Sequence, residues 1–351
     1  MALSRLILTD FRNHAVLTLQ PEAQFIALHG ANGAGKTNIL EAVSLLVPGR
    51  GLRRAALSDM IRTGGCGGFA VSAEFEGTTI GTGVNSDQPE RRKVRVNGSN
   101  AAINSLAEWL AVIWLTPSMD RLFVEGAGAR RRFLDRLVLA LEPSHAHHSS
   151  RYEKAVQQRN RLLTGATSPD AMWLDALEAQ MAENGKAIIE ARSRMVQALR
   201  EQLAIAPQAP FAIPDIRLVD KDAVPPDGLA NAWRRGRRRD AAAGRTLIGP
   251  HRADLNVTHL VSGQPAERCS TGEQKALLLS LILAHAALVT AQRETPPILL
   301  LDEVAAHLDP SRREALFEQL ADTGAQVWMT GTEPELFNGI GPTAQLVAVG
   351  A

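Results

Sequence analysis

A glycine-rich stretch near the N-terminus carries the residue types that bind a phosphate chain. Gly30, Gly35, Lys36 and Thr37 fill the pattern G-x-x-x-x-G-K-[S/T]. The glycines let successive backbone N–H groups curve around an anion, the lysine can reach the terminal phosphates, and the threonine hydroxyl is placed for Mg²⁺. The alternative is a glycine-rich turn that binds nothing.

The flanking sequence supplies the elements that a phosphate-binding loop requires. Residues 25–28 are an apolar run typical of a buried strand, and apolar residues recur at helical spacing from Ile39 to Leu46. A loop between a strand and a helix N-terminus lies where the helix end favours an anion. This context argues against the empty turn and predicts a nucleoside triphosphate site. The residues expected to contact the nucleotide here are Gly30, Ala31, Asn32, Gly33, Ala34, Gly35, Lys36, Thr37 and Asn38.

Two consecutive acids near the C-terminus provide a second candidate for the same chemistry. Residues 298–301 are apolar, as in a buried parallel strand, and Asp302 and Glu303 follow at its carboxyl end. We expect Asp302 to hold Mg²⁺ together with Thr37, and Glu303 to orient and deprotonate the attacking water. Two acids after a strand mean little alone. With the glycine-rich loop they predict nucleotide hydrolysis, with Glu303, Asp302 and Lys36 as the catalytic set.

A third segment, residues 269–275, opens a long apolar helix with Ser270 as a natural N-cap. An ordinary helix start is the alternative. The order of motifs along the chain is a glycine-rich loop, a long insertion, Ser-x-Gly-x-Gln at a helix start, an acidic strand end and then His307-Leu308-Asp309. This order resembles that of ABC-type ATPases, which favours a role for the segment in the nucleotide site.

The composition excludes several classes of protein. The 351 residues include 38 basic and 37 acidic side chains, so any nucleic-acid surface must be a local patch. The two cysteines, Cys66 and Cys269, have no metal-ligand spacing and suit a reducing compartment. The N-terminus lacks the features of a signal peptide, and the longest apolar run, residues 276–289, is too short to span a bilayer. We expect a cytoplasmic protein without a membrane partner.

The periodicity of the sequence predicts three regions. Residues 1–117 should form the N-terminal part of an ATPase domain, residues 118–240 an inserted helical lobe, and residues 241–351 the C-terminal part of the ATPase domain. In the first region, strands are expected at 3–8 and 15–19 around a turn, and a β subdomain at 70–75, 78–84 and 93–96, with Asn97-Gly98 as a turn.

In the middle region, helical spacing predicts an antiparallel hairpin. Helices are expected at 130–141, 149–163 and 171 to about 203, with a polar break at 164–170. A compact lobe is favoured over a projecting coiled coil because each arm is short. The proline-rich stretch 206–226 contains strand-like pieces at 211–213 and 216–219.

Two clusters of basic residues are candidates for a nucleic-acid surface. The first is the arginine run 234–239 and the second is Arg91-Arg92-Lys93. For the run, a phosphate-binding surface and a solvated helix face are equally open.

Several further segments resemble the RecF family of recombination and gap-repair ATPases, which is related to the head domains of SMC proteins. They are spread along almost the whole chain: Phe11-Arg12-Asn13, residues 117–135 ending in Arg130-Arg131-Arg132-Phe133-Leu134-Asp135, Tyr152 with residues 158–163, and Gly249-Pro250-His251-Arg252-Ala253-Asp254-Leu255. No long coiled-coil arm is present, unlike in a true SMC protein.

The resemblance implies a fold, an activity and partners. The expected fold is α/β, an ABC-type P-loop ATPase head of the SMC type with an inserted helical lobe. The expected activity is slow, DNA-stimulated hydrolysis of ATP with Mg²⁺. The implied partners are gapped, single-stranded and duplex DNA, a second copy of the chain in an ATP-dependent dimer, and recombination mediators such as RecR and RecO, in a cytoplasmic, nucleoid-associated setting.

The resemblance also implies site residues beyond the P-loop. Ser270 and Gly272, with Gln274, should complete the nucleotide site of the opposite subunit, and Asp309 should lie near the dimer seam. Thr330 or Thr332, with Thr332 preferred for the nucleotide site, should sense the γ-phosphate. The chain departs from the family at Thr271 and Glu273, where glutamine or glycine is usual, and at Ala253, where a second acid is expected.

Two other functions fit part of the sequence. An ABC subunit that energises membrane transport has the same nucleotide motifs, but the β subdomain, the helical hairpin and residues 249–255 argue against it. A nucleotide-dependent scaffold without hydrolysis is the other, and the presence of both Lys36 and Glu303 argues against it.

Overall fold

The computed structural model describes residues 2–165, 170–206, 210–220 and 228–350. The chain divides into two compact units, which are described separately: Met1–Asp120, Ile205–Ala212 and Lys275–Ala351 form the first, and Arg121–Ala204 and Ile213–Gln274 form the second. The second unit includes residues 241–274, which the sequence analysis placed with the C-terminal part of the ATPase domain. The functional division into an ATPase domain and an insertion stays a prediction.

A five-stranded parallel sheet organises the first unit. In spatial order its strands are β13 (Ala344–Ala348), β3 (Phe25–His29), β12 (Gln326–Gly331), β11 (Ile298–Leu301) and β8 (Val112–Leu115). The strands expected before the glycine-rich loop and before the two acids are therefore β3 and β11, with β12 between them. Because parallel strands end at one edge of the sheet, the loop and the acids lie at the same edge.

An antiparallel sheet forms the rest of the β structure of this unit. Its order is β2 (His14–Leu19), β1 (Arg5–Phe11), β4 (Phe69–Phe75), β5 (Thr78–Asn85), β6 (Gln88–Val96) and β7 (Ser99–Asn100). The strands and the Asn97-Gly98 turn are where we expect them, and both turn residues have positive φ, 49° and 80°. The strands of the expected β subdomain share one sheet with β1 and β2, because β1 pairs with β4.

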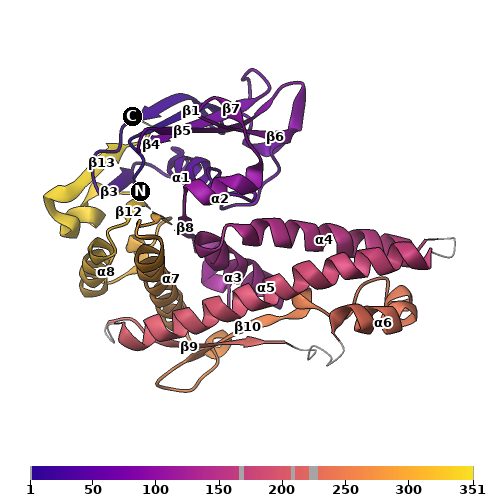
Figure 1. Cartoon of the computed structure of the whole chain (residues 1–351). Helices are drawn as coiled ribbons and strands as arrows, with labels where there is room; N and C mark the ends of the chain where they lie inside the picture. The colour runs from indigo at the N-terminus through magenta and orange to yellow at the C-terminus, as the bar shows by residue number, and fades with distance from the viewer. Residues whose placement is uncertain (1, 166–169, 207–209, 221–227, 351) are drawn as a thin grey trace. The chain divides into compact units, whose positions relative to one another are not determined.

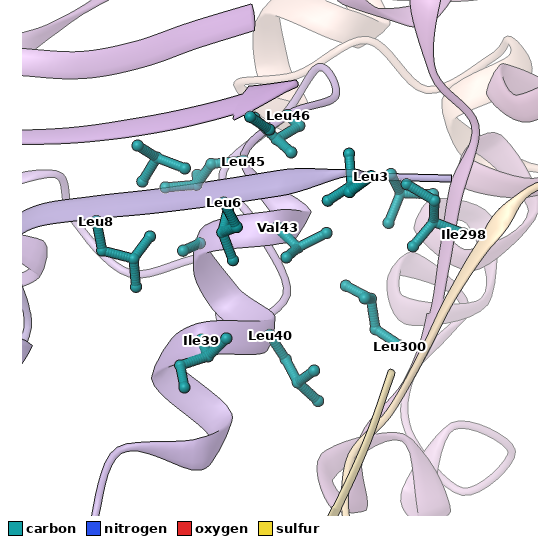
Figure 2. Packing of buried hydrophobic residues seen from close by; sticks show 14 of the residues in the cluster. Leu3, Leu6, Leu8, Ile39, Leu40, Val43, Leu45, Leu46, Ile298 and Leu300 are labelled. Atoms are coloured by element: carbon teal, nitrogen blue, oxygen red, sulfur yellow. The ribbon is translucent and has the colours of Figure 1, made fainter. Parts of the chain in front are cut away.

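The helix that follows the glycine-rich loop, α1 (Lys36–Ser44), lies in the core of the unit. Ile39, Leu40 and Val43 are fully buried and pack against Leu6 and Leu8 of β1, with Leu300 of β11 in the same cluster (Figure 2). Burying a side chain of this size stabilises the fold by about 1.5–3 kcal/mol. The residues that fix the position of the loop are thus also core residues. The unit also contains α2 (Leu106–Trp109), α7 (Thr271–Arg293) from Lys275 onward and α8 (Pro310–Asp322).

Among the described residues, one helix is long and apolar enough to cross a membrane, namely α7 (Thr271–Arg293), with a mean hydropathy of 1.6 in its most apolar window. It is longer than the apolar run 276–289 on which the sequence analysis based its argument against a span. Of that window, 78% is buried inside the protein, as in the core helix of a soluble protein. The helix is therefore a weak indication of a membrane span.

The second unit contains the predicted helical hairpin. Its helices are α3 (Ala127–Leu141), α4 (Ser144–Leu163), α5 (Ala171–Ile205) and α6 (Leu229–Ala243). Helices α4 and α5 run side by side (Figure 1), and hydrogen bonds from His148 to Asn184 and from Arg159 to Glu178 show that they are antiparallel. Of the polar break predicted at 164–170, residues 166–169 lie outside the described residues.

A two-stranded antiparallel sheet, β9 (Pro214–Val219) with β10 (Asp254–His259), completes this unit. The strand expected at 216–219 is present in β9, whereas residues 211–213 form no strand. Parts of the proline-rich stretch, residues 207–209 and 221–227, lie outside the described residues.

A buried arginine connects three helical segments of the second unit. Arg159 of α4 has no exposed surface, and its guanidinium donates to Glu178 at 2.9 Å, to Asp240 at 2.8 Å and to the Thr246 hydroxyl at 2.9 Å. The carbonyl of Trp233 accepts a fourth bond at 3.0 Å. Because a buried charge is costly unless it is paired and hydrogen-bonded, these contacts fix α4, α5 and α6 in one arrangement.

Arg130 and Tyr152, which lie in two other segments that resemble the RecF family, hold the segment 249–255. Arg130 pairs with both carboxylate oxygens of Asp254 at 2.8 Å, and the Tyr152 hydroxyl bonds His251 Nδ1 at 2.8 Å. The carbonyl of Thr246 lies 3.0 Å from His251 Nε2, so Nε2 carries the proton and Nδ1 accepts. Burial lowers the pKa of His251 and favours this neutral form.

Candidate functional site

The glycine-rich loop follows β3 and turns back into α1. Gly30, Gly33 and Gly35 have φ of 140°, 84° and 108°, a region that residues with a Cβ rarely adopt. A Cβ on Gly30 would lie 2.5 Å from the carbonyl oxygen of Val349, and one on Gly35 would lie 2.6 Å from the Asn13 amide. Both the backbone conformation and the space therefore require glycine at positions 30 and 35.

Lys36 reaches back across this loop. Its ammonium donates to the carbonyl oxygens of Gly30 at 2.6 Å and Ala31 at 2.9 Å, and its side chain is buried. The charge is thus held against the loop, at the N-terminus of α1. An anion in the loop would meet the ammonium, the backbone N–H groups and the positive end of the helix together.

The oxygens suited to a magnesium ion lie beside the loop. Thr37 Oγ1 donates to Asp302 Oδ1 at 2.8 Å, across the gap from α1 to the end of β11. Burial raises the pKa of Asp302, whereas the hydrogen bonds from Thr330 and Thr37 act in the opposite direction and favour the ionised carboxylate. A hydroxyl and a carboxylate oxygen that converge at a phosphate loop match the way proteins hold Mg²⁺ on a nucleotide.

Glu303 stands next to this pair in an unusual backbone conformation. Its φ is 54°, in the left-handed region, and its N–H donates to the hydroxyl of Thr330 at 2.8 Å. Residues held in such conformations cost of order 1–3 kcal/mol and are found at functional sites. The side chain is half-buried, so it can face both the protein and a bound water.

A polar network that no local sequence pattern predicts supports the loop from behind. The Asn13 amide donates to the carbonyl of Ala34 at 2.9 Å, and its oxygen accepts from Asn38 at 2.7 Å. Arg12 binds both carboxylate oxygens of Glu41, at 2.8 and 2.9 Å. The Arg12-Asn13 turn, noticed only as part of a resemblance, therefore anchors both the loop and α1. A signal was present, because Glu41 is an acid between the apolar pairs Ile39-Leu40 and Ala42-Val43.

The segment 269–275 begins α7, and residues 269–274 belong to the second unit. Ser270 is its N-cap and forms a reciprocal capping box with Glu273. The Ser270 N–H and hydroxyl both donate to Glu273 Oε2 at 2.8 Å, and Glu273 N–H donates to the Ser270 hydroxyl at 3.3 Å. Gln274 is buried and donates to the carbonyl of Cys269 at 2.8 Å. The capping box thus gives a structural reason for Glu273, which departs from the family pattern.

The remaining predicted site residues have separate positions. Asp309 is the N-cap of α8, where its carboxylate accepts from the N–H of Arg312 at 3.0 Å. Gly272 is exposed at the start of α7, and Thr332 is exposed just beyond β12. The structure brings together residues 30–38, Asp302 and Glu303, with Thr330 as the hydroxyl between the acids. The roles of Ser270, Gly272, Gln274, Asp309 and Thr332 stay predictions.

Comparison with known proteins identifies the family. A family model described as "RecF/RecN/SMC N terminal domain" matches residues 2–349. The DNA replication and repair protein RecF of Mesorhizobium japonicum is 48% identical, with 99% of this chain and 96% of the relative covered. The chain belongs to the RecF family. The RecF protein of Rhizobium rhizogenes is 49% identical over the same shares of both proteins.

Solved structures share the fold of this RecF-family chain. The structure titled "recombination mediator protein RecF-ATPrS in RecFOR pathway" has a TM-score of 0.83 at 22% identity and covers 99% of this chain and 96% of its own. An Smc head domain from Pyrococcus furiosus has a TM-score of 0.55 at 16% identity, covering 99% and 92%. The predicted fold class, an α/β ABC-type ATPase head of the SMC type, is confirmed.

Membership of the RecF family also confirms the predicted resemblance and the general function. The chain is an ATPase of DNA replication and repair. No comparison supports the alternative of a subunit that energises membrane transport.

Proposed function

We propose that this RecF-family chain is an ATP-gated DNA clamp of recombinational repair. ATP binding would join two chains around DNA at single-strand gaps and duplex junctions, mediators such as RecR and RecO would be recruited to load recombinase, and slow hydrolysis would release the clamp. The single observation that carries the ATP-dependent part is the convergence of Lys36, Thr37, Asp302 and Glu303 at one edge of the parallel sheet. A cytoplasmic location, at the nucleoid, follows from this role.

The residues of this edge would divide the work of hydrolysis. The glycine-rich loop and Lys36 would bind the phosphates of ATP. Thr37 and Asp302 would hold Mg²⁺, which neutralises charge on the phosphates when bound. Glu303 would accept a proton from the attacking water, and its half-buried position limits the competing approach of solvent.

The segment at the start of α7 would act on the nucleotide of the second copy. The N-terminus of a helix of 23 residues presents unpaired backbone N–H groups and partial positive charge to an anion. Ser270 would offer its hydroxyl to the γ-phosphate across the dimer, next to Gly272 and Gln274. Asp309 would lie near the interface between the two chains, and Thr332 would sense the γ-phosphate.

Two substitutions separate ATP binding from dimer formation. Lys36→Ala should weaken ATP binding to the single chain by about 10- to 100-fold, the worth of a charge-assisted contact. Ser270→Ala should leave that affinity unchanged but prevent the ATP-dependent dimer. ATP affinity by calorimetry and mass by light scattering, each with and without DNA, measure both. A Ser270→Ala variant that still dimerises with ATP would remove the proposed role across the seam.

The two basic clusters, residues 234–239 and residues 91–93, differ in their contacts. In the run 234–239, Arg237 pairs with Glu178 at 2.6 Å and Arg234 with Asp175 at 3.0 Å, so part of its charge is used inside the lobe. In β6, Arg92 points inward: it donates to the carbonyl of Gly49 at 2.7 Å, and burial lowers its pKa to about 10. Its neighbours Arg91 and Lys93 are exposed. Each cluster thus keeps exposed basic side chains, and we propose β6, where Arg91 and Lys93 lie on one face of the strand, as the phosphate-binding surface.

Neutralising that surface should reduce the salt dependence of DNA binding. In the double variant Arg91→Gln/Lys93→Gln, the slope of log affinity against log salt should fall by about 0.9 for each DNA phosphate that is no longer neutralised. The matched control is Arg238→Gln/Arg239→Gln, which removes two exposed arginines from α6. Fluorescence anisotropy with gapped duplex DNA at several salt concentrations measures both. An effect confined to the control would place the DNA-binding surface on α6.

A further inference from the structure

A threonine of the central strand lies between the two acids of the nucleotide site. Thr330 belongs to β12, which separates the strand of the glycine-rich loop from the strand that ends at the acids. Only 1% of Thr330 is exposed. Its hydroxyl donates to Asp302 Oδ1 at 2.8 Å and accepts the N–H of Glu303 at 2.8 Å. One side chain therefore contacts both consecutive acids.

The directions of these two bonds are fixed by chemistry. A threonine hydroxyl has one proton and can both donate and accept, whereas an ionised carboxylate only accepts and a backbone N–H only donates. The proton of Thr330 must therefore point at Asp302, and an oxygen lone pair must face Glu303. Because the hydroxyl is buried, water does not compete for either bond.

The two bonds act on different properties of the acids. At Asp302, Thr330 and Thr37 approach the same oxygen, each at 2.8 Å, so the carboxylate is held from two sides. At Glu303, the bond anchors the backbone N–H of a residue with φ of 54°, a conformation that relaxes unless its surroundings hold it. Removal of the hydroxyl would release both constraints and leave the Glu303 N–H without this acceptor.

We propose that Thr330 is a positioning residue for ATP hydrolysis: its hydroxyl orients the Asp302 carboxylate toward Thr37 and holds Glu303 in the backbone conformation that directs its side chain to the attacking water. This inference rests on the proposed function of the two acids. It differs from γ-phosphate sensing, because Thr330 acts through Asp302 and Glu303 and need not touch the nucleotide.

The test is Thr330→Val, which replaces the hydroxyl by a methyl group of similar size. Turnover of ATP should fall by about 10- to 100-fold, as for other residues that orient catalytic ligands, while KM for ATP stays nearly constant.

A binding measurement tests the same inference without turnover. ATP-dependent thermal stabilisation of the protein can be titrated with Mg²⁺ at fixed ATP. In Thr330→Val, the Mg²⁺ concentration that gives half of this stabilisation should rise by about 10- to 100-fold. The melting temperature without nucleotide checks that the variant is folded.

Two further variants make the result decisive. Thr330→Ser keeps the hydroxyl and should restore turnover and the Mg²⁺ requirement, whereas Thr9→Val makes the same change at an exposed threonine of β1 and should alter neither of them. Wild-type behaviour of Thr330→Val, or equal impairment of Thr330→Ser, would overturn the inference. Suppose that Thr330→Val keeps full turnover. If Lys36→Ala and Glu303→Gln keep it too, the proposed nucleotide site is wrong. If they lose turnover, the site stands and only the proposed role of Thr330 is wrong.

Discussion

Replacing Glu303 by glutamine is expected to lower ATP turnover by about 10²- to 10⁴-fold, the usual contribution of a general base. Glutamine has nearly the same shape but cannot accept a proton from water. Lys36, Thr37 and Asp302 stay in place, so ATP affinity should change little. The ATP-bound dimer should therefore accumulate and retain DNA. Single-turnover hydrolysis, light scattering and retention of gapped, duplex and single-stranded DNA in the same samples measure these effects.

The chain offers a closely matched control for this substitution. Glu294, which follows α7, also has a left-handed backbone with φ of 55°, but it is exposed and lies outside the candidate site. Glu294→Gln makes the same chemical change in the same backbone conformation and should leave turnover unchanged. If Glu303→Gln binds ATP but retains no DNA, the clamp is contradicted. Turnover equal to that of Glu294→Gln would show that Glu303 is not the base.

Arg159→Ala is expected to destabilise the helical lobe by about 3–5 kcal/mol, as for a buried ion pair from which one partner is removed. The substitution leaves Glu178 and Asp240 buried without their shared cation. Glu178 keeps its ion pair with Arg237, whereas Asp240 loses the arginine with which it is paired. Hydrogen exchange of α4 and α5 measures the destabilisation.

The control is Arg161→Ala, two residues along the same helix, where the side chain is exposed. Surface substitutions of this kind usually change stability by about 0.5 kcal/mol or less. Similar exchange rates in the two variants would mean that the buried arginine contributes no more than an exposed one.

The parts of the site that could be predicted are those formed by residues that are adjacent in the sequence. The glycine-rich loop, the apolar run 298–301 and the acids after it each combine a local pattern with a local structural requirement. Parallel strands end at one edge, so the pairing of the loop with Asp302 followed from general topology. The Asn97-Gly98 turn was equally local, because its type depends on two residues alone.

The parts that could not be predicted depend on pairings between distant residues. The pairing of β1 with β4 joins residues 61 to 69 positions apart, and no periodicity within either strand specifies it. Arg92 was grouped with Arg91 and Lys93 by charge, but alternation along the strand turns it inward to the carbonyls after α1. The sequence suggests only a nucleotide-sensing role for Thr330. Its contacts with Asp302 and Glu303 depend on the pairing of β12 with β11, which lies outside the local sequence.

The order of strands in the parallel sheet has a consequence for how the protein is made. β3, which leads into the phosphate loop, is flanked by β12 and β13, and these are encoded about 300 residues later. At a synthesis rate of about 5–20 residues per second, the ribosome needs roughly 15–60 s to go from β3 to β13. During this time β3 lacks both of its neighbouring strands. The nucleotide site is therefore among the last parts of a nascent chain that can form, and a chain released before β12 should fail to bind ATP.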